Sequence, residues 1–388
     1  MRSLLEFART LTPDLGPEGI LKSVLRTIMG KGLITEGFSY LSSKNEDGEL
    51  RYHLVNRSGF LGLDLPLVIS FEMLETWLFT PPERTHFTLP IFDSEQQDII
   101  GFLGFGKSLS PEGDIATEQN YLESLSLLTG IALTNAALFE SERERERFEA
   151  ELRLAREIQQ SLLPQSLLEM KGFSFTVYSK QSELVGGDYY DIIKLDEHKA
   201  LVAIADVVGK GVSAAILMSN LQASLRAMIT TLRLNQINLK VMVSDLNRLI
   251  YESTTAERYI TAVFAVIDNS SGELSTIVCG HPRPILASAN GQYSELPTSG
   301  VPLGVIPNYD FIPSDVKFTS GSSIIFYTDG LSEAVSGGHM LGAKGVENFV
   351  RMLAGEGSNP QSIEATLSSI AGLTVTDDVT VVMVKRLT

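Results

Sequence analysis

One long helical stretch without proline divides this sequence. It starts near the capping-like segment DIATEQ at residues 114–119 and stops at Pro164. Apart from Gly130 it contains no helix-breaking residue. The parts before and after it consist mainly of short apolar runs separated by turn residues. A chain of 388 residues also exceeds the usual size of a single hydrophobic core. The pattern therefore predicts two domains joined by a stiff linker helix over residues 115–165.

Residues of this stretch taken in alternate steps of four and three form a coiled-coil seam with a polar middle. The seam positions are Leu127, Ile131, Thr134, Leu138, Ser141, Arg145, Phe148, Leu152, Ala155, Gln159 and Leu162. Two interpretations stay open: a parallel coiled coil that makes the protein a homodimer, which we favour, and a solvated single helix. In either case the helix is stiff enough to transmit a rearrangement, so Phe148 and Leu152 are predicted regulatory positions.

Composition and charge exclude several classes of partner and site. The formal net charge is −16 and the isoelectric point is about 4.8, whereas nucleic acids and anionic membranes bind positively charged faces. We therefore expect neither as a partner. Cys279 is the only cysteine, which excludes an intramolecular disulfide and a thiolate zinc site. The N-terminus lacks a signal-type apolar core and no apolar run approaches membrane-spanning length, so we predict a cytoplasmic protein.

The first half of the chain alternates short apolar runs with turn-rich gaps. The runs are GFSYLSS, ELRYHLV, HFTLPIF and DIIGFLGFG, and the flanking segments have helical spacing. This pattern predicts a small α/β unit of the size of a sensor domain. Residues 99–140, where a strand-like run leads into the long helix, resemble the end of a GAF domain. The resemblance extends over residues 1–140 and implies a sensor scaffold, not a particular ligand.

The signal that such a sensor would detect stays open. Residues 1–140 contain no cysteine for a bilin and no cyclic-nucleotide signature, and His53 and His86 are single histidines in strand-like runs, which supports haem only weakly. The alternatives are a small organic ligand, a protein signal, or a pocket that has lost its ligand and serves only for dimerisation.

Beyond the long helix the pattern turns to strands again. The strand-like segments are FSFTVYS, DYYDIIKL, ALVAIADV, ITAVFAVID, ELSTIVCG, SSIIFYTDG and TVVMVK. Helical stretches interrupt them at residues 212–233, 239–254 and 345–354. Antiparallel strands with segregated helices predict an α+β domain over residues 166–388.

Aspartates stand at both ends of the hairpin-like segment VGGDYYDIIKLDEHKALVAIADVVGKG, residues 185–211. If the turn is centred on Glu197, Asp188 lies opposite Asp206 and both point to one face of the hairpin, whereas a slip of one residue would separate them. Carboxylates at a strand end are the oxygen ligands that Mg²⁺ and Mn²⁺ take. The glycines beside them let the backbone approach an ion or a phosphate closely.

Further aspartates stand at the ends of later strands. Asp329 follows the run SSIIFY, and Asp377 and Asp378 precede the run TVVMVK. An Asp-Gly pair alone, such as Asp329-Gly330, is an ordinary turn signal. Acidic residues at four places where apolar strands end are harder to explain as turns, and together they predict an oxygen-rich cluster.

The motifs that contain these residues resemble those of the metal-dependent PPM-type protein phosphatases, and within them the bacterial SpoIIE/RsbU branch. In chain order they are AREIQQSLLP at 155–164, GGDYYD at 186–191, DVVGKG at 206–211, CGHPRPIL at 279–286, PLG at 302–304, FYTDG at 326–330 and DDVT at 377–380. The resemblance covers residues 150–388. It implies an α-β-β-α sandwich of antiparallel sheets that holds a pair of Mn²⁺ or Mg²⁺ ions at one end.

The resemblance also implies roles for the strand-end residues. Asp206 would bridge the two ions, and the main-chain carbonyl of Val207 would complete one coordination shell. Asp188 would ligate directly or through water. Asp329 and Asp377 would hold the second ion.

Other motif residues have less defined roles. Asp378 is the alternative to Asp377, and Asp191 would support the ligands without touching an ion. His281 fits either an acid for the leaving oxygen or a structural turn residue, and we favour the turn residue. No motif marks an arginine for the substrate phosphate, so the phosphate contact stays open.

The activity implied by the resemblance is hydrolysis of phosphoserine or phosphothreonine by a metal-activated water, without a protein nucleophile. The implied substrate is a phosphorylated anti-sigma-factor antagonist in a partner-switching pathway. The alternative is a catalytically inactive pseudophosphatase that serves as a dimeric binding module. In this branch, activity commonly depends on the helix after the DVVGKG motif, so Val212, where that helix begins, is a further predicted regulatory position.

Overall fold

The computed structural model describes residues 9, 11–45, 47–59, 65–95, 97–109, 115, 118–182, 184–232, 238–255, 257–356 and 360–387. The chain forms two compact units, Met1–Phe148 and Glu149–Thr388. The predicted capping segment DIATEQ lies partly outside the described residues.

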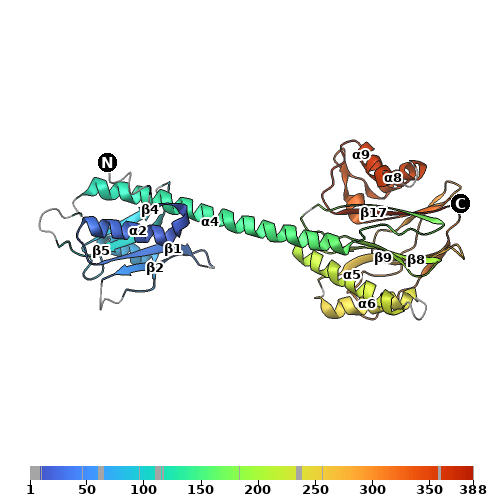
Figure 1. The fold of residues 1–388 in the computed structure, drawn as a ribbon, viewed down its shortest axis with the longest axis horizontal. Coiled ribbons are helices and arrows are strands. Elements are labelled where there is room, and N and C mark those ends of the chain that lie inside the picture. Colours follow the sequence, from blue (N-terminus) through green and yellow to red (C-terminus); the bar gives the residue numbers. More distant parts are fainter. Residues whose placement is uncertain are drawn as a thin grey trace. The chain divides into compact units, whose positions relative to one another are not determined.

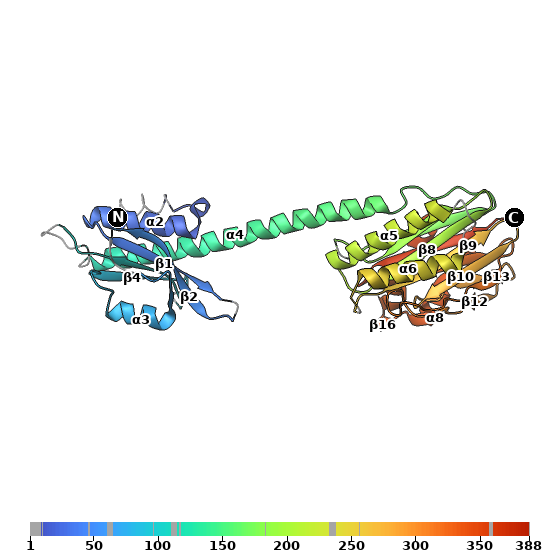
Figure 2. The ribbon, with the colours of Figure 1, turned by 90° about the horizontal axis from the view of Figure 1, so that it is seen from below.

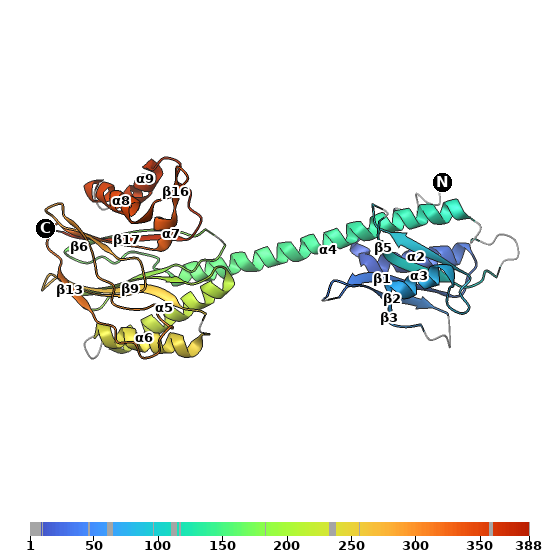
Figure 3. The ribbon, with the colours of Figure 1, turned by 180° about the vertical axis from the view of Figure 1, so that it is seen from behind.

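An antiparallel sheet in the order β3-β2-β1-β5-β4 forms the centre of the N-terminal unit (Figure 3). Its strands are β1 Gly37–Lys44, β2 Leu50–Ser58, β3 Val68–Ser70, β4 Phe87–Phe92 and β5 Ile99–Phe105. The four apolar runs predicted as strands are β1, β2, β4 and β5, which confirms that part of the prediction. The sequence did not predict β3, because three residues are too few to show an alternation.

Helices cover both faces of this sheet. The short 3-10 helix η1, Pro13–Leu15, leads into α2, Gly16–Lys31, which packs with the start of α4, Gln119–Leu162, on one face. The other face carries α3, Phe71–Phe79. There the aromatic rings of Phe38, Tyr40, Trp77 and Phe102 pack on one another, with centroids 5.8–6.4 Å apart. The space beneath α3 is therefore occupied by the protein's own aromatic rings.

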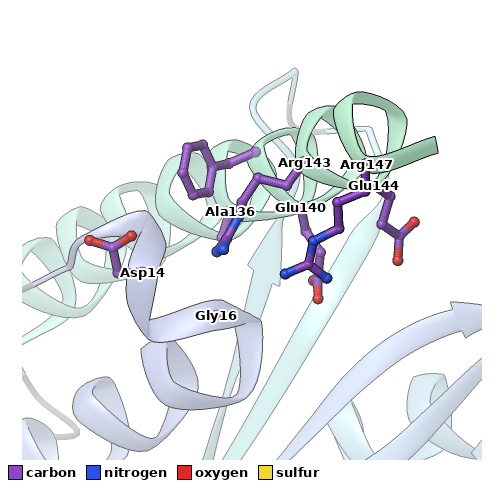
Figure 4. A pocket seen from close by; sticks show the side chains of 8 residues that line it. Asp14, Gly16, Ala136, Glu140, Arg143, Glu144 and Arg147 are labelled. Atoms are coloured by element: carbon purple, nitrogen blue, oxygen red, sulfur yellow. The ribbon is translucent and has the colours of Figure 1, made fainter. Parts of the chain in front are cut away.

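Hollows are found on the α2 and α4 side of this unit. One of about 260 Å³ lies between the start of α2 and α4, and charged side chains of both signs surround it (Figure 4). Its lining residues are Asp14, Gly16, Ala136, Phe139, Glu140, Arg143, Glu144 and Arg147. Another, of about 420 Å³, is mainly apolar and includes Leu41, Ile100 and Leu133 in its walls.

Helix α4, Gln119–Leu162, lies within the helix predicted over residues 115–165 and ends before Pro164. Four of its seam residues are between 41% and 61% exposed: Leu127, Ile131, Leu138 and Phe148. These side chains form an apolar face that a second helix could cover. Gln159 is instead 3% exposed and is hydrogen-bonded within its own chain. The seam prediction is therefore wrong at Gln159, because other residues of the C-terminal unit already cover that position. Pairing of α4 with a second chain stays a prediction.

Two antiparallel sheets are stacked in the described part of the C-terminal unit (Figure 1). One has the order β13-β10-β9-β8-β7 and the other the order β12-β11-β14-β17-β6. The strands are β6 Phe173–Lys180, β7 Tyr189–Lys194, β8 Lys199–Val207, β9 Ile260–Asp268, β10 Glu273–Cys279, β11 Ile285–Ala287, β12 Tyr293–Glu295, β13 Ser314–Lys317, β14 Ser323–Tyr327 and β17 Val379–Arg386. The hairpin of β15, Val335–Ser336, and β16, His339–Met340, lies outside these sheets. All strand-like segments predicted in this half are strands.

Helices cover the outer face of each sheet, which completes the α-β-β-α sandwich. Figure 2 shows α5, Val212–Leu232, and α6, Leu239–Ser253, over the sheet that contains β8 and β9. Helices α8, Gly342–Glu356, and α9, Pro360–Ser369, cover the sheet that contains β17 (Figure 1). The short helix α7, Asp329–Glu333, directly follows β14. The sequence missed α7, α9 and the short strands β11 to β13.

Among the described residues, two helices are long and apolar enough to cross a membrane, α4 and the Val212–Thr231 part of α5. This differs from the expectation that no segment reaches such a length. The evidence for a membrane span is weak, because a core helix of a soluble protein meets the same criterion. In α5 the side chains of Met218, Leu221 and Leu225 are buried against the sheet, as expected of a core helix.

Candidate metal centre

The hairpin of β7 and β8 has the register expected for a turn centred on Glu197. Tyr189 pairs with Ala205, and one step further this register places Asp188 opposite Asp206. Side chains alternate between the two faces of a strand. Ile204, which shares a face with Asp206, lies in the core between the sheets. Both aspartates therefore point into one end of the space between the sheets.

Thr328 links the opposite sheet to Asp188. This buried residue directly follows β14, and its hydroxyl donates a hydrogen bond to Asp188 Oδ2 at 2.9 Å. Its oxygen accepts a hydrogen bond from the Thr380 backbone N–H, also at 2.9 Å. Asp188 is 4% exposed, and its Oδ1 has no hydrogen-bond partner among the described residues. One carboxylate oxygen is thus held in place, and the other can bind a ligand.

The carboxylate of Asp378 holds the backbone that precedes Asp188. Its Oδ1 accepts from the Ser182 N–H at 2.8 Å and the Ser182 hydroxyl at 3.0 Å, and its Oδ2 accepts from the Gly187 N–H at 2.9 Å. A Cβ on Gly186 would lie 2.2 Å from Asp378 Oδ2. Only glycine fits so close to this oxygen. Asp378 therefore binds the chain's own N–H and O–H groups.

Asp377 and Asp329 lie at the more exposed rim of the cluster. Lys210, in the DVVGKG loop, places its ammonium 3.1 Å from Asp377 Oδ2. The same ammonium donates to the Thr376 carbonyl at 3.3 Å. Asp329 is the first residue of α7 and is half-buried.

The pKa values of Asp188, Asp206 and Asp329 are raised by burial first and by neighbouring carboxylates second, so the aspartates are electrostatic neighbours. Burial raises the pKa of Asp206 to about 7, and the charges of Asp329, Asp377 and Asp378 contribute in the same direction. Burial, and then the charge of Asp206, raises the pKa of Asp188 well above its usual value. Burial also raises the pKa of Asp329. A cluster of negative charge of this kind favours a cation.

The C-terminal unit has recognisable relatives. A family model described as Stage II sporulation protein E (SpoIIE) matches residues 196–387. The C-terminal unit is a SpoIIE-type phosphatase domain. The match begins after β7 and covers β8 and the whole of both later aspartate motifs.

Individual proteins agree with this assignment of the SpoIIE-type domain. The phosphoserine phosphatase RsbU of Bacillus subtilis is 24% identical over 240 residues, which are 61% of this chain and 70% of RsbU. Protein IcfG of a Synechocystis species is 30% identical over 209 residues, 48% of this chain and 33% of IcfG. The chain thus spans between a third and about two thirds of the length of these relatives. The SiaA-PP2C domain of Pseudomonas aeruginosa has a similar fold, with a TM-score of 0.55 at 18% identity over 62% of this chain and 98% of that domain.

The aspartates of the SpoIIE-type domain suit divalent cations as ligands, although they do not form a complete coordination shell. Among the described residues, no three Asp, Glu, His or Cys side chains converge closely enough to enclose an ion. The mutual repulsion of the carboxylates and the ion pair of Asp377 with Lys210 both oppose such convergence. The buried, unpartnered Asp188 Oδ1 and the oxygen-only donor set suit Mg²⁺ or Mn²⁺. A Cβ on Gly187 would lie 2.9 Å from the Val207 carbonyl oxygen, so this carbonyl also lies close to the loop.

Asp191 lies on the opposite face of β7 from Asp188 and does not support the cluster as expected. It is 1% exposed and faces α5, where Arg226 donates to it through Nε at 2.8 Å and through a terminal nitrogen at 3.0 Å. The Tyr189 hydroxyl also donates to it at 2.9 Å. The reason is the strand's two-residue period, because residues 188 and 191 differ by an odd number of steps. Asp191 fixes α5 to the sheet.

His281 fits the structural interpretation. Burial lowers the pKa of this imidazole to about 3, so it is neutral at physiological pH. Its Nδ1 is 2.8 Å from the Thr261 hydroxyl oxygen, and this threonine lies 3.5 Å from the Asp206 carbonyl oxygen. A neutral, buried imidazole is a poor proton donor to a leaving group.

Several residues of the site were not predicted from the sequence. Thr328, Thr380, Lys210 and Gln159 all lie inside the quoted motifs, but nothing in the sequence showed which partner each would contact. Their positions inside the motifs were the signal that could have marked them as residues of the site. Ser182 lies outside these motifs and carried no signal.

Proposed function

We propose that this protein is a metal-dependent phosphatase that hydrolyses phosphoserine or phosphothreonine in proteins. The observation that carries the proposal is the convergence of aspartates from three distant segments at one end of the sandwich, with the buried Asp188 Oδ1 left without a partner. The relative named phosphoserine phosphatase RsbU supports the substrate class.

In this proposal Asp188, Asp206, Asp329 and Asp377, with the Val207 carbonyl, hold two Mn²⁺ or Mg²⁺ ions. When bound, such ions acidify water and stabilise the charge on phosphate oxygens. The chain's own residues orient the ligands. Thr328 holds one oxygen of Asp188 by its hydroxyl. Both carboxylate oxygens of Asp378 already accept hydrogen bonds from the chain, so Asp377 is the more suitable metal ligand of these two residues.

We expect phosphate release from a phosphoserine protein to require Mn²⁺ or Mg²⁺. The full chain should lose activity in excess EDTA and regain it when Mn²⁺ is restored, because the carboxylates alone cannot activate water. Asp329→Ala should remove the Mn²⁺-dependent rate. Colorimetric phosphate release is the measurement. A rate that survives both EDTA and Asp329→Ala would show that the aspartate cluster is not the active site.

The proposed substrate is a phosphorylated anti-sigma-factor antagonist in a partner-switching pathway, as the resemblance of the motifs to the SpoIIE/RsbU branch implies. The second candidate function is a pseudophosphatase that binds partners without catalysis. The ion pair with Lys210, which already engages Asp377, a proposed ligand, favours it. Calorimetric Mn²⁺ binding without phosphate release, tested on several phosphoproteins, would support this second function.

We further propose that residues 1–140 are a GAF-like sensor that regulates the phosphatase domain through α4. The sheet order β3-β2-β1-β5-β4 with helices on both faces is compatible with such a scaffold. The aromatic rings that fill the space beneath α3 favour a sensor that responds to a protein or serves for dimerisation over one that encloses a small molecule there. The cytoplasmic location also remains a proposal.

The exposed face of α4 leads us to expect that Phe148→Glu combined with Leu152→Glu converts a homodimer into monomers. Phe148 is 59% exposed, and charges at seam positions oppose helix pairing. If the linker transmits regulation, the basal phosphatase rate should change by about five-fold or more, the lower end of typical coupling between sites. Sedimentation and phosphate release measure the two effects. The exposed Glu151→Gln is the control, and unchanged mass together with an unchanged rate would contradict the role of the seam.

A further inference from the structure

Gln159, near the C-terminal end of α4, makes a reciprocal contact with the backbone of Gly186. Its Nε2 donates to the Gly186 carbonyl at 2.6 Å, and its Oε1 accepts from the Gly186 N–H at 3.2 Å. The Oε1 also accepts from Gln181 Nε2 at 3.3 Å. The side chain is 3% exposed. One side-chain amide thus satisfies both hydrogen-bonding groups of a single loop residue.

The residue that Gln159 holds lies two positions before Asp188. Three contacts follow one another along this loop: Gln159 binds Gly186, Asp378 accepts from the Gly187 N–H, and Thr328 donates to Asp188. The contacts to Asp378 and Thr328 come from the opposite sheet, whereas the contact to Gln159 comes from α4. Each fixes one residue of the loop, and the last orients a carboxylate that we propose as a metal ligand.

The exposure of neighbouring glutamines shows that the contact is specific to one position. Gln160 follows directly and is exposed, whereas Gln159 is almost completely buried. The end of α4 has a second attachment, since Gln222 Nε2 on α5 donates to the Leu162 carbonyl at 3.2 Å. That bond reaches only the helix backbone and makes no contact with the loop. Gln159 thus connects α4 to the loop of Asp188 through its side chain.

We infer that Gln159 is a positioning residue for the metal centre, which acts through Gly186 on Asp188 and makes the ligand geometry dependent on the position of α4. The inference rests on the proposed function. A buried amide hydrogen bond that fixes a ligand's backbone raises affinity by reducing the conformations that the loop must lose on binding the ion. A shift of α4 that breaks this contact would free the loop and weaken the site.

The test compares Gln159→Ala with Gln160→Ala in the full chain, using Mn²⁺ alone as the probe in calorimetry. We expect Gln159→Ala to weaken Mn²⁺ binding about 10- to 100-fold, the usual effect of losing a group that orients a metal ligand. Amide exchange in a peptide containing Gly186 and Asp188 should become faster. Gln160→Ala should change neither quantity. At saturating Mn²⁺ the kcat of Gln159→Ala should return towards that of the parent protein, because the ligands themselves are intact.

Gln159→Glu keeps the side-chain length and the acceptor but cannot donate to the Gly186 carbonyl when ionised, so it should also weaken Mn²⁺ binding. If the melting curve of Gln159→Ala shows that it does not fold, Gln159→Glu takes its place in the test. If the parent binds Mn²⁺ and the Gln159 variants bind it as tightly as Gln160→Ala, Gln159 only stabilises the fold and the inference is wrong, while the proposed function stands. If the parent protein binds no Mn²⁺, the proposed function fails and the inference fails with it.

Discussion

Asp206→Asn should abolish Mn²⁺-dependent phosphate release, with a loss of about a thousand-fold or more. Asp206 ends β8 opposite Asp188, and it is the carboxylate whose pKa responds to Asp329, Asp377 and Asp378 together. It is therefore the central charge of the cluster. Ions that stabilise several kcal/mol of transition-state charge account for a rate factor of about this size. An asparagine keeps the shape but removes the charge that would bind the cations.

The measurement is phosphate release from a phosphoserine protein across a range of Mn²⁺ concentrations, beside calorimetric Mn²⁺ binding. Asp315→Asn, an exposed aspartate on β13 of the same sheet, is the matched control and should retain full activity. Loss of activity in both variants would indicate a general loss of folding. Full activity in Asp206→Asn would show that the aspartate cluster does not carry the reaction.

The metal-free protein should become less stable as the pH rises from about 4 to about 7. Asp206 has a folded-state pKa of about 7 against a usual value of 3.8. A carboxyl whose folded pKa is raised favours the folded state fully below its unfolded pKa, and this advantage is lost as the pH rises through the folded pKa. The shift corresponds to about 2–4 kcal/mol after allowance for partial exposure. Asp188 and Asp329, whose pKa values are also raised, act in the same direction.

Melting temperatures in EDTA, measured for the parent protein and for Asp206→Asn, test this expectation. The two proteins should melt together near pH 4, and Asp206→Asn should melt several degrees higher at pH 8, because the neutral amide removes repulsion. Mn²⁺ should raise the melting temperature of the parent at pH 8 and have little effect on the variant. A parent protein that is as stable as the variant at pH 8 in EDTA would mean that the carboxylates do not repel one another as the structure indicates.

Much of the fold is readable from the sequence because most elements are long. Eight-residue strands such as β6 and β17 and helices such as α5 have enough residues to show their period. Elements of three or four residues, among them β11 and β13, were missed because tertiary pairing and not local pattern makes them strands. The seam on α4 was extended too far for a related reason: periodicity shows which face is apolar, not what covers it, and Gln159 is covered by its own chain.

The candidate site, like the fold, was predictable from the sequence in part. The order and spacing of the motifs indicated Asp188, Asp206, Asp329 and Asp377. The sequence left the register of the hairpin open, and the structure has the one, with the turn centred on Glu197, that places the first two together. Asp191 shows the limit of this reasoning, because its motif position suggested a supporting role whereas the strand's alternation turns it towards Arg226.

The sequence by itself determined the two-unit organisation, the linker helix, most of the long strands and the acidic residues of the site, because each of these depends on neighbours close along the chain. Only the tertiary structure decided which oxygen of Asp188 is held by Thr328, that Asp378 holds the Gly187 backbone, and that Gln159 binds Gly186. The partners in the first two contacts are 140 and 191 residues apart. Contacts of this kind depend on how the sheets and helices pack, and no local pattern in the sequence encodes them.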